Sequence, residues 1–136
     1  MIDPTPYIGI PFKEREASLT GADCWGLVAV VYRGEGMREV PSYGQYDSLS
    51  DEAGMQDELR AALEDWQQVA GEGPDEIAAK ARQGDVLLFR FGYRPHVGLY
   101  LGGRVMLHTE RGALSHTADF TGPRFRHRLL GAFRYG

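Results

Sequence analysis

One cysteine, Cys24, and two histidines far downstream, His96 and His108, are the residues of this chain that could carry out nucleophilic catalysis. A lone cysteine cannot form an internal disulfide. Cys24 follows a glycine-containing turn and precedes the apolar run 25–32, which predicts the first turn of a buried helix. The backbone N–H groups and the helix dipole favour a thiolate there. A single cysteine with distant histidines is typical of a cysteine hydrolase.

The spacing of the two histidines sets a geometric condition. A nucleophilic cysteine needs a base, here His96, and the base needs an orienting partner, here His108. A two-residue hairpin loop between their strands would point the two rings to opposite faces of the sheet, whereas the three-residue loop 102–104 would place them on one face. We predict the three-residue loop, with His108 opposite Gly98.

Two other interpretations of these residues stay open. Cys24 could be a small buried core residue without reactivity. Cys24, His96 and His108 could also bind zinc, although the sequence lacks the close ligand pairs typical of zinc sites. We predict no metal and no cofactor. The remaining histidines, His116 and His127, are expected to be surface or structural residues.

The residues on either side of the cysteine are candidates for substrate binding. Asp23 is predicted to be the N-cap of the helix, and its carboxylate could also bind an amine of the substrate. Trp25, the next residue after Cys24, is the second candidate.

The elements that position these residues are helical in the first half of the chain. We predict a first helix over 24–33, a loop over 34–50 and a second helix over 51–65. Residues 66–69 could end that helix or begin a short strand. A connection over 71–84 is expected to contain one helical turn near residues 76–81.

The second half of the chain has the pattern of an antiparallel sheet. The predicted strands span residues 85–91, 96–101, 105–109, 125–130 and 132–135. Helices followed by a strand meander predict an α+β fold with the Cys24 helix packed on the sheet.

Composition indicates a single soluble domain over residues 1–136. The net charge is −4, and although residues 84–136 are rich in arginine, no nucleic-acid motif accompanies them, so we expect no nucleic-acid partner. No apolar run is long enough to span a membrane. The N-terminus has no signal-peptide pattern, so we expect synthesis in the cytoplasm.

Five segments together resemble the NlpC/P60 family of cysteine peptidases. They are Tyr7–Phe12, Gly21–Val28, Gly84–Phe89, His96–Gly102 and Leu107-His108. The resemblance covers nearly the whole chain. It implies a papain-like fold and cleavage of peptidoglycan stem peptides, usually between γ-D-glutamate and a diamino acid. It also implies Cys24 as nucleophile, His96 as base and His108 as the third member.

The sequence departs from the family's pattern at one rim of the expected site. Family members often carry a tyrosine twelve residues before the cysteine, with its hydroxyl near the oxyanion, and this chain has Phe12 there. The usual Gly-Gly that follows is replaced by residues 13–16, which are all charged. Oxyanion stabilisation is then left to backbone N–H groups at the helix start.

The chain is most similar to phage-tail members of the family, including the tail-assembly protein K group and gene-transfer-agent peptidases. The similarity lies in the sequence around Cys24, the long insert between the first helix and the sheet, and the arginine-rich C-terminal end. We therefore predict a cell-wall cysteine endopeptidase of a phage tail or prophage, acting at the bacterial cell wall, with peptidoglycan stem peptides and tail-tip proteins as partners. The alternatives are a tail-tip structural protein with little activity and an amidase or acyltransferase that uses the same Cys–His site.

Overall fold

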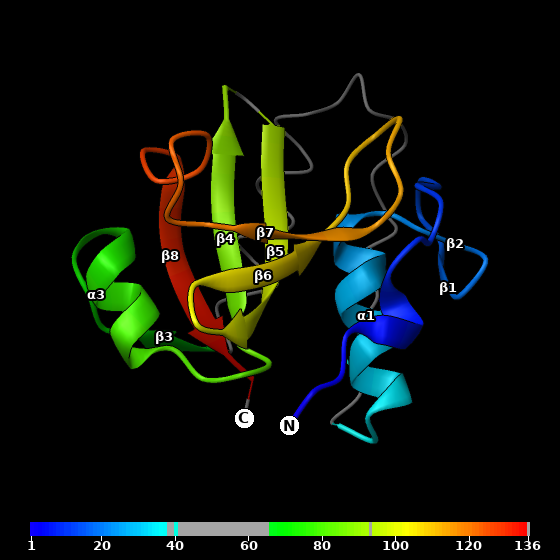
Figure 1. Ribbon diagram of the computed structural model, residues 1–136, viewed down its shortest axis with the longest axis horizontal. Helices are drawn as coiled ribbons and strands as arrows, with labels where there is room; N and C mark the ends of the chain where they lie inside the picture. The colour runs from blue at the N-terminus through cyan, green and yellow to red at the C-terminus, as the bar shows by residue number, and fades with distance from the viewer. Residues whose placement is uncertain (38–39, 41–65, 93, 136) are drawn as a thin grey trace.

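The computed structural model describes residues 1–37, 40, 66–92 and 94–135 (Figure 1). Its helical elements are η1 (Thr5–Tyr7), α1 (Cys24–Gly34) and α3 (Gly73–Lys80). Its strands are β1 (Ala17–Ser18), β2 (Gly21–Ala22), β3 (Gln67–Val69), β4 (Val86–Phe91), β5 (Arg94–Gly102), β6 (Val105–His108), β7 (His116–Asp119) and β8 (Leu129–Arg134). The helix expected over 51–65 and most of the loop expected over 34–50 lie outside the described residues.

A six-stranded sheet in the order β3-β8-β4-β5-β6-β7 forms the centre of the molecule, and every neighbouring pair is antiparallel. Strands β1 and β2 form a separate antiparallel pair just before α1. Figure 1 shows α1 on one side of the sheet and α3 on the other, beside β8 and β3. The predicted α+β class, with the Cys24 helix against an antiparallel sheet, is confirmed.

The cysteine-bearing helix α1 begins where the sequence predicts. The Asp23 carboxylate accepts a 2.6 Å hydrogen bond from the Gly26 N–H and so caps the helix. Seven of its residues are buried: Trp25, Gly26, Leu27, Val28, Val30, Val31 and Tyr32. A Cβ on Gly26 would lie 1.9 Å from the Glu16 carbonyl oxygen, so only glycine lets the N-terminal segment cross the first turn. Both contacts hold the start of α1, and with it Cys24, in a fixed position.

The sheet buries side chains on both faces. Along β4, Val86 and Leu88 belong to the core that includes α1, whereas Leu87 and Phe89 belong to a second core that includes Ile77 of α3. This division follows from the alternation of side chains along a strand. Complete burial of such an aliphatic or aromatic side chain contributes roughly 1.5–3 kcal/mol to stability.

The predictions about the C-terminal strands are wrong in part. Residues 125–128 form turns rather than a strand, and the single strand β8 spans residues 129–134 where two strands were predicted. The apolar Phe125 misled the prediction, because its ring fills the second core from a turn that starts at Gly122. The edge strand β7 was not expected, since its residues alternate between half-buried and exposed positions and carry no apolar run.

The other helix and strand boundaries agree with the predicted ones or lie slightly beyond them. Strands β4, β5 and β6 fall where strands were predicted, and α1 is one residue longer than expected. The single turn expected near residues 76–81 is the helix α3, and residues 67–69 form a strand rather than a helix end. In the part of the chain that the structure describes, no helix is both long and apolar enough to cross a membrane.

Candidate active site

The two histidines predicted to act together are in contact. His96 on β5 and His108 at the end of β6 place Nε2 and Nδ1 at 3.0 Å, and their ring planes are nearly perpendicular, at 88°. Leu99 pairs with Leu107, so the same register continued by one residue sets His108 opposite Gly98. The prediction that the two rings share a face of the sheet is confirmed.

The hairpin has this register, but the predicted three-residue loop is wrong. Gly102 pairs with Val105, which leaves a two-residue turn of Gly103 and Arg104, both with positive φ. The pairing shifts between Tyr100 and Gly102, so Leu101 is an extra residue in the strand. This bulge changes the alternation by one position, as an odd loop would, and so keeps both imidazoles on one face.

Cys24 meets the sheet at the edge of β5, one residue from His96. The N–H and C=O of Tyr100 bond toward β4, to Asp85 and Gly84, so the N–H of Val97 points the other way, toward β6. Strand β6 ends at His108, and the backbone N–H of Val97 is close enough to the Cys24 thiol to lower the pKa of that thiol. The thiol therefore lies beside the His96–Val97 peptide, next to the strand end that carries His108.

The thiol is held in its protonated form. Burial and the nearby Asp23 carboxylate raise the pKa of Cys24 to about 12, although hydrogen bonds from the backbone N–H groups of Val97, Trp25 and Cys24 lower it in part. The thiolate expected from the helix N-terminus is therefore not the resting form. The helix-end N–H groups are present, but the Asp23 charge and desolvation outweigh them.

Both imidazoles are neutral near pH 7. Burial lowers the pKa of His96 to about 4; the Glu110 carboxylate opposes this shift and the Arg124 guanidinium adds to it. The pKa of His108 falls to about 3, first through burial and then because a second positive charge beside His96 is unfavourable. A neutral imidazole has a free lone pair, which is the form that a general base requires.

Aromatic rings enclose the His96 imidazole. The rings of Phe89, Phe91 and Phe125 lie 5.9, 5.7 and 6.5 Å from it between centroids, and Phe125 also packs edge-on against His108. These rings exclude water from His96 and keep its pKa low. Phe125 was not predicted to be near the site, because the apolar pattern of residues 125–130 predicts a strand there.

Both oxygens of the Asp23 carboxylate accept hydrogen bonds from backbone N–H groups. One oxygen caps α1, and the other accepts a 2.9 Å hydrogen bond from the Arg15 N–H. Trp25 is buried, with its ring centroid 5.7 Å from that of Trp66. The structure thus gives both residues a structural role, and substrate binding by either stays a prediction.

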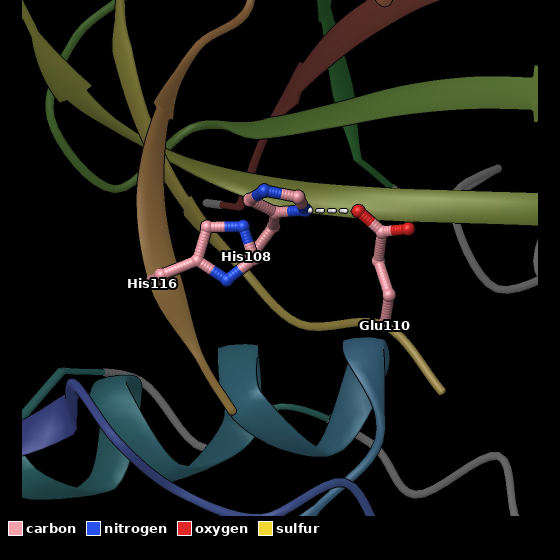
Figure 2. A group of neighbouring side chains, drawn as sticks. All are labelled: His108, Glu110 and His116. Atoms are coloured by element: carbon pink, nitrogen blue, oxygen red, sulfur yellow. Dashed lines mark ion pairs between the residues drawn. The ribbon is translucent and has the colours of Figure 1, made fainter. Parts of the chain in front are cut away.

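Three polar residues near His108 were not predicted as part of the site. Figure 2 shows His108 between Glu110, which follows it by two residues, and His116, its direct cross-strand partner on β7. Arg124 holds the Glu110 carboxylate through both oxygens. Sequence offered one weak signal, since residues 108 and 110 alternate onto the same side of an extended chain.

The zinc interpretation of Cys24, His96 and His108 finds no support. Within the described ranges, the ligand atoms that lie close enough to share a metal ion come from His108, Glu110 and His116 instead.

Comparison with known proteins identifies the family. A family model described as NlpC/P60 family matches residues 9–134. This chain belongs to the NlpC/P60 family. No curated protein is similar enough to this sequence to count as a match.

Solved structures of NlpC/P60 proteins have the same fold. An NLP/P60-family protein from Staphylococcus aureus Mu50, described as similar to lipoprotein, is 25% identical with a TM-score of 0.63 over 94% of this chain and 37% of its own. The NlpC/p60 domain of the peptidoglycan hydrolase SagA is 18% identical, with a TM-score of 0.62 over 96% of this chain and 92% of that domain. NlpC2 from Trichomonas vaginalis is 16% identical, with a TM-score of 0.61 over 96% and 44%.

This chain thus spans little more than a third of the staphylococcal protein. The matches support the NlpC/P60 assignment, and none of these three is described as a phage-tail protein.

Phe12, the departure from the NlpC/P60 pattern, lies close to the cysteine in the fold. Its backbone forms a parallel bridge with Ala22, two residues before Cys24. The ring is half-buried and carries no hydroxyl to donate to an oxyanion.

Proposed function

We propose that this NlpC/P60 domain is a cysteine endopeptidase that cleaves peptidoglycan stem peptides. The observation that carries the proposal is the 3.0 Å contact between His96 and His108 at the strand edge where the Cys24 thiol lies. A nucleophile, a base and an orienting group are brought together from residues 24, 96 and 108 by the packing of α1 on β5. Family membership and the likeness to a peptidoglycan hydrolase domain support the substrate class.

The neutral state of the site defines the first chemical step. His96 takes the proton from the Cys24 thiol as the sulfur attacks the amide carbonyl, so the thiolate forms only with the substrate in place. The N–H groups of Cys24 and Trp25 at the start of α1 then stabilise the oxyanion. His96 returns the proton to the leaving amine, and water cleaves the thioester.

One proton arrangement of the histidine pair suits this mechanism. If His96 donates through Nε2 to Nδ1 of His108, its own Nδ1 keeps the lone pair that accepts the thiol proton. His108 must then carry its proton on Nε2. The opposite arrangement would put a proton on His96 Nδ1 and block the base.

The bond proposed for cleavage joins γ-D-glutamate to a diamino acid, which the family resemblance implies. Synthetic muropeptides test it directly: one with a γ-linkage, one with an α-linkage at the same glutamate, and one with L-glutamate. Cleavage of the first alone, with release of the diamino acid fragment seen by mass spectrometry, is the expected result. Cleavage at the sugar–alanine junction would instead identify an amidase.

A role as a phage-tail or prophage component is a further part of the proposal and rests on the sequence around Cys24 and the arginine-rich end. In this role the protein is made in the cytoplasm and acts at the cell wall as part of the virion tail. Mass spectrometry of purified particles from a lysogen tests it. Detection of this chain in tails supports the role, and its absence from intact tails contradicts it.

A tail protein with the fold but little activity is the second candidate. The raised pKa of Cys24 and the missing hydroxyl at Phe12 favour it. The alkylation rate of Cys24 at pH 8 separates the two candidates. A catalytic thiol should react more slowly after His96→Ala because the base is lost, whereas an inert thiol should be unaffected.

A further inference from the structure

A group of three potential metal ligands lies beside the histidine pair. The ligand atoms of His108, Glu110 and His116 are all within 4.8 Å of one another. His108 and His116 are direct partners across β6 and β7, with ring centroids 4.4 Å apart, and Nδ1 of His108 lies 3.8 Å from Oε1 of Glu110. Figure 2 shows the three side chains converging from two strands and the segment that joins them.

Two of the three residues are already oriented by a second partner. Nδ1 of His116 lies 2.8 Å from the Leu114 carbonyl oxygen, so this nitrogen carries the proton and Nε2 keeps its lone pair. Arg124 holds the Glu110 carboxylate. Metal-binding imidazoles and carboxylates are usually fixed in this way, by a carbonyl behind the histidine and a donor behind the carboxylate.

The burial of the group leaves an entry path. The His108 side chain is fully buried, whereas Glu110 exposes 28% of its side chain and His116 is half-buried. An ion can therefore approach from the side of Glu110 and His116. Arg124 forms an ion pair with the Glu110 carboxylate on that side.

We propose that His108, Glu110 and His116 bind a zinc ion that competes with His96 for Nδ1 of His108. Two imidazoles and one carboxylate are a ligand set that zinc accepts, with water in the fourth position. The nitrogen of His108 that faces Glu110 is the one that contacts His96. Coordination of Nδ1 breaks the His96–His108 hydrogen bond and involves no redox change.

The consequence for catalysis rests on the proposed function. With zinc bound, His96 loses its orienting acceptor and the endopeptidase is inhibited, although Cys24 itself is untouched. Zinc binding at His108, the third member of the triad, thus inhibits the enzyme reversibly.

Calorimetric titration of zinc chloride into the folded protein tests the site without requiring activity. The wild-type protein and Cys24→Ala should bind one zinc ion with equal affinity. His116→Gln should bind it more than about 100-fold more weakly, because the loss of an outer partner alone costs about 10–100-fold. Glu110→Gln is a second variant on the same ligand set. His127→Gln, at an exposed histidine outside the site, is the matched control and should bind like wild type.

Saturable binding that Cys24→Ala abolishes, or that His116→Gln and Glu110→Gln leave unchanged, would overturn the proposed site. So would the lack of any binding by the wild type.

A second measurement tests the competition with His96. The proton shared by His96 and His108 should give a downfield ring N–H resonance that His108→Ala lacks, and zinc should remove this signal from the wild type but not from His116→Gln. If zinc binds and the signal persists, the competition is wrong. This readout holds even if the protein proves to have no peptidase activity, so failure of the proposed function can be told apart from failure of the switch.

Discussion

His96 and His108 face each other with Nε2 and Nδ1 at 3.0 Å and their rings nearly perpendicular. In the proposed mechanism Nε2 of His96 donates its proton to Nδ1 of His108 across this contact. That arrangement leaves the lone pair on the other nitrogen of His96, Nδ1, to accept the thiol proton. His108 is thus a positioning residue that acts through His96.

Replacement of His108 tests this positioning role. His108→Ala should lower kcat by roughly 10²–10⁴-fold, as removal of the orienting residue does in other triads, with little change in KM. His108→Asn should recover part of the loss because its amide oxygen can accept from His96. The exposed His127→Ala is the control. Equal loss in His108→Ala and His108→Asn would contradict the hydrogen-bonding role.

Stability should fall in mild acid because both histidines are buried in the neutral form. The pKa values of His96 and His108 are about 4 and about 3 in the folded protein, and about 6.5 in the unfolded chain. The stabilisation is therefore complete above pH 6.5 and is lost as the pH falls toward the folded values. Each histidine contributes a slope of up to about 1.4 kcal/mol per pH unit.

Urea unfolding at pH 7, 6 and 5 measures this slope, above the range in which carboxylates titrate. The His96→Asn, His108→Asn double variant should show a flatter dependence of the free energy of unfolding on pH. An unchanged slope in that variant would mean that other groups cause the loss.

The reactivity of Cys24 should reflect a neutral thiol. Because its pKa is about 12, alkylation by iodoacetamide at pH 7 should be slower than that of free cysteine and should rise with pH through pH 9. Asp23→Asn keeps a cap for Gly26 but removes the charge that raises the pKa, so it should react faster at pH 7. A wild-type rate that is as high at pH 5 as at pH 9 would instead show a preformed thiolate–imidazolium pair.

Phe12→Tyr should raise activity by supplying the hydroxyl that the family usually places near the oxyanion. The bridge between Phe12 and Ala22 sets the position of this ring next to the start of α1. One added oxyanion donor can increase kcat by up to about 10²-fold. Phe133→Tyr on β8 is the control for adding a tyrosine elsewhere. An unchanged kcat in folded Phe12→Tyr would show that the hydroxyl does not reach the oxyanion.

Local patterns in the sequence were enough to predict the cysteine helix and the shared face of the histidines. Asp23 as a cap and the apolar run after Cys24 predicted α1. The number of residues between His96 and His108 limited the hairpin to pairings in which His108 lies opposite Gly98 and both rings share a face of the sheet. The loop type was wrong because a two-residue turn with a bulge at Leu101 gives the same alternation as a three-residue loop. Sequence alone does not distinguish these two solutions.

The residues around the histidine pair could not be predicted because tertiary contacts place them. His116 lies on an edge strand with no apolar pattern, and Phe125 reaches the site from a turn. The expectation that the start of the helix favours a Cys24 thiolate was wrong for a similar reason. Burial and the orientation of Asp23 decide the pKa of this thiol, and neither can be read from the neighbouring residues.

Digestion of purified peptidoglycan by the wild-type protein and by Cys24→Ala tests whether Cys24 is the nucleophile of a cell-wall peptidase. The wild type should release stem-peptide fragments, identified by mass spectrometry. Cys24→Ala should release none while its free energy of unfolding stays within about 1 kcal/mol of wild type, because the change removes a single sulfur atom. Fragments released equally by both proteins would contradict the assignment of Cys24 as the nucleophile.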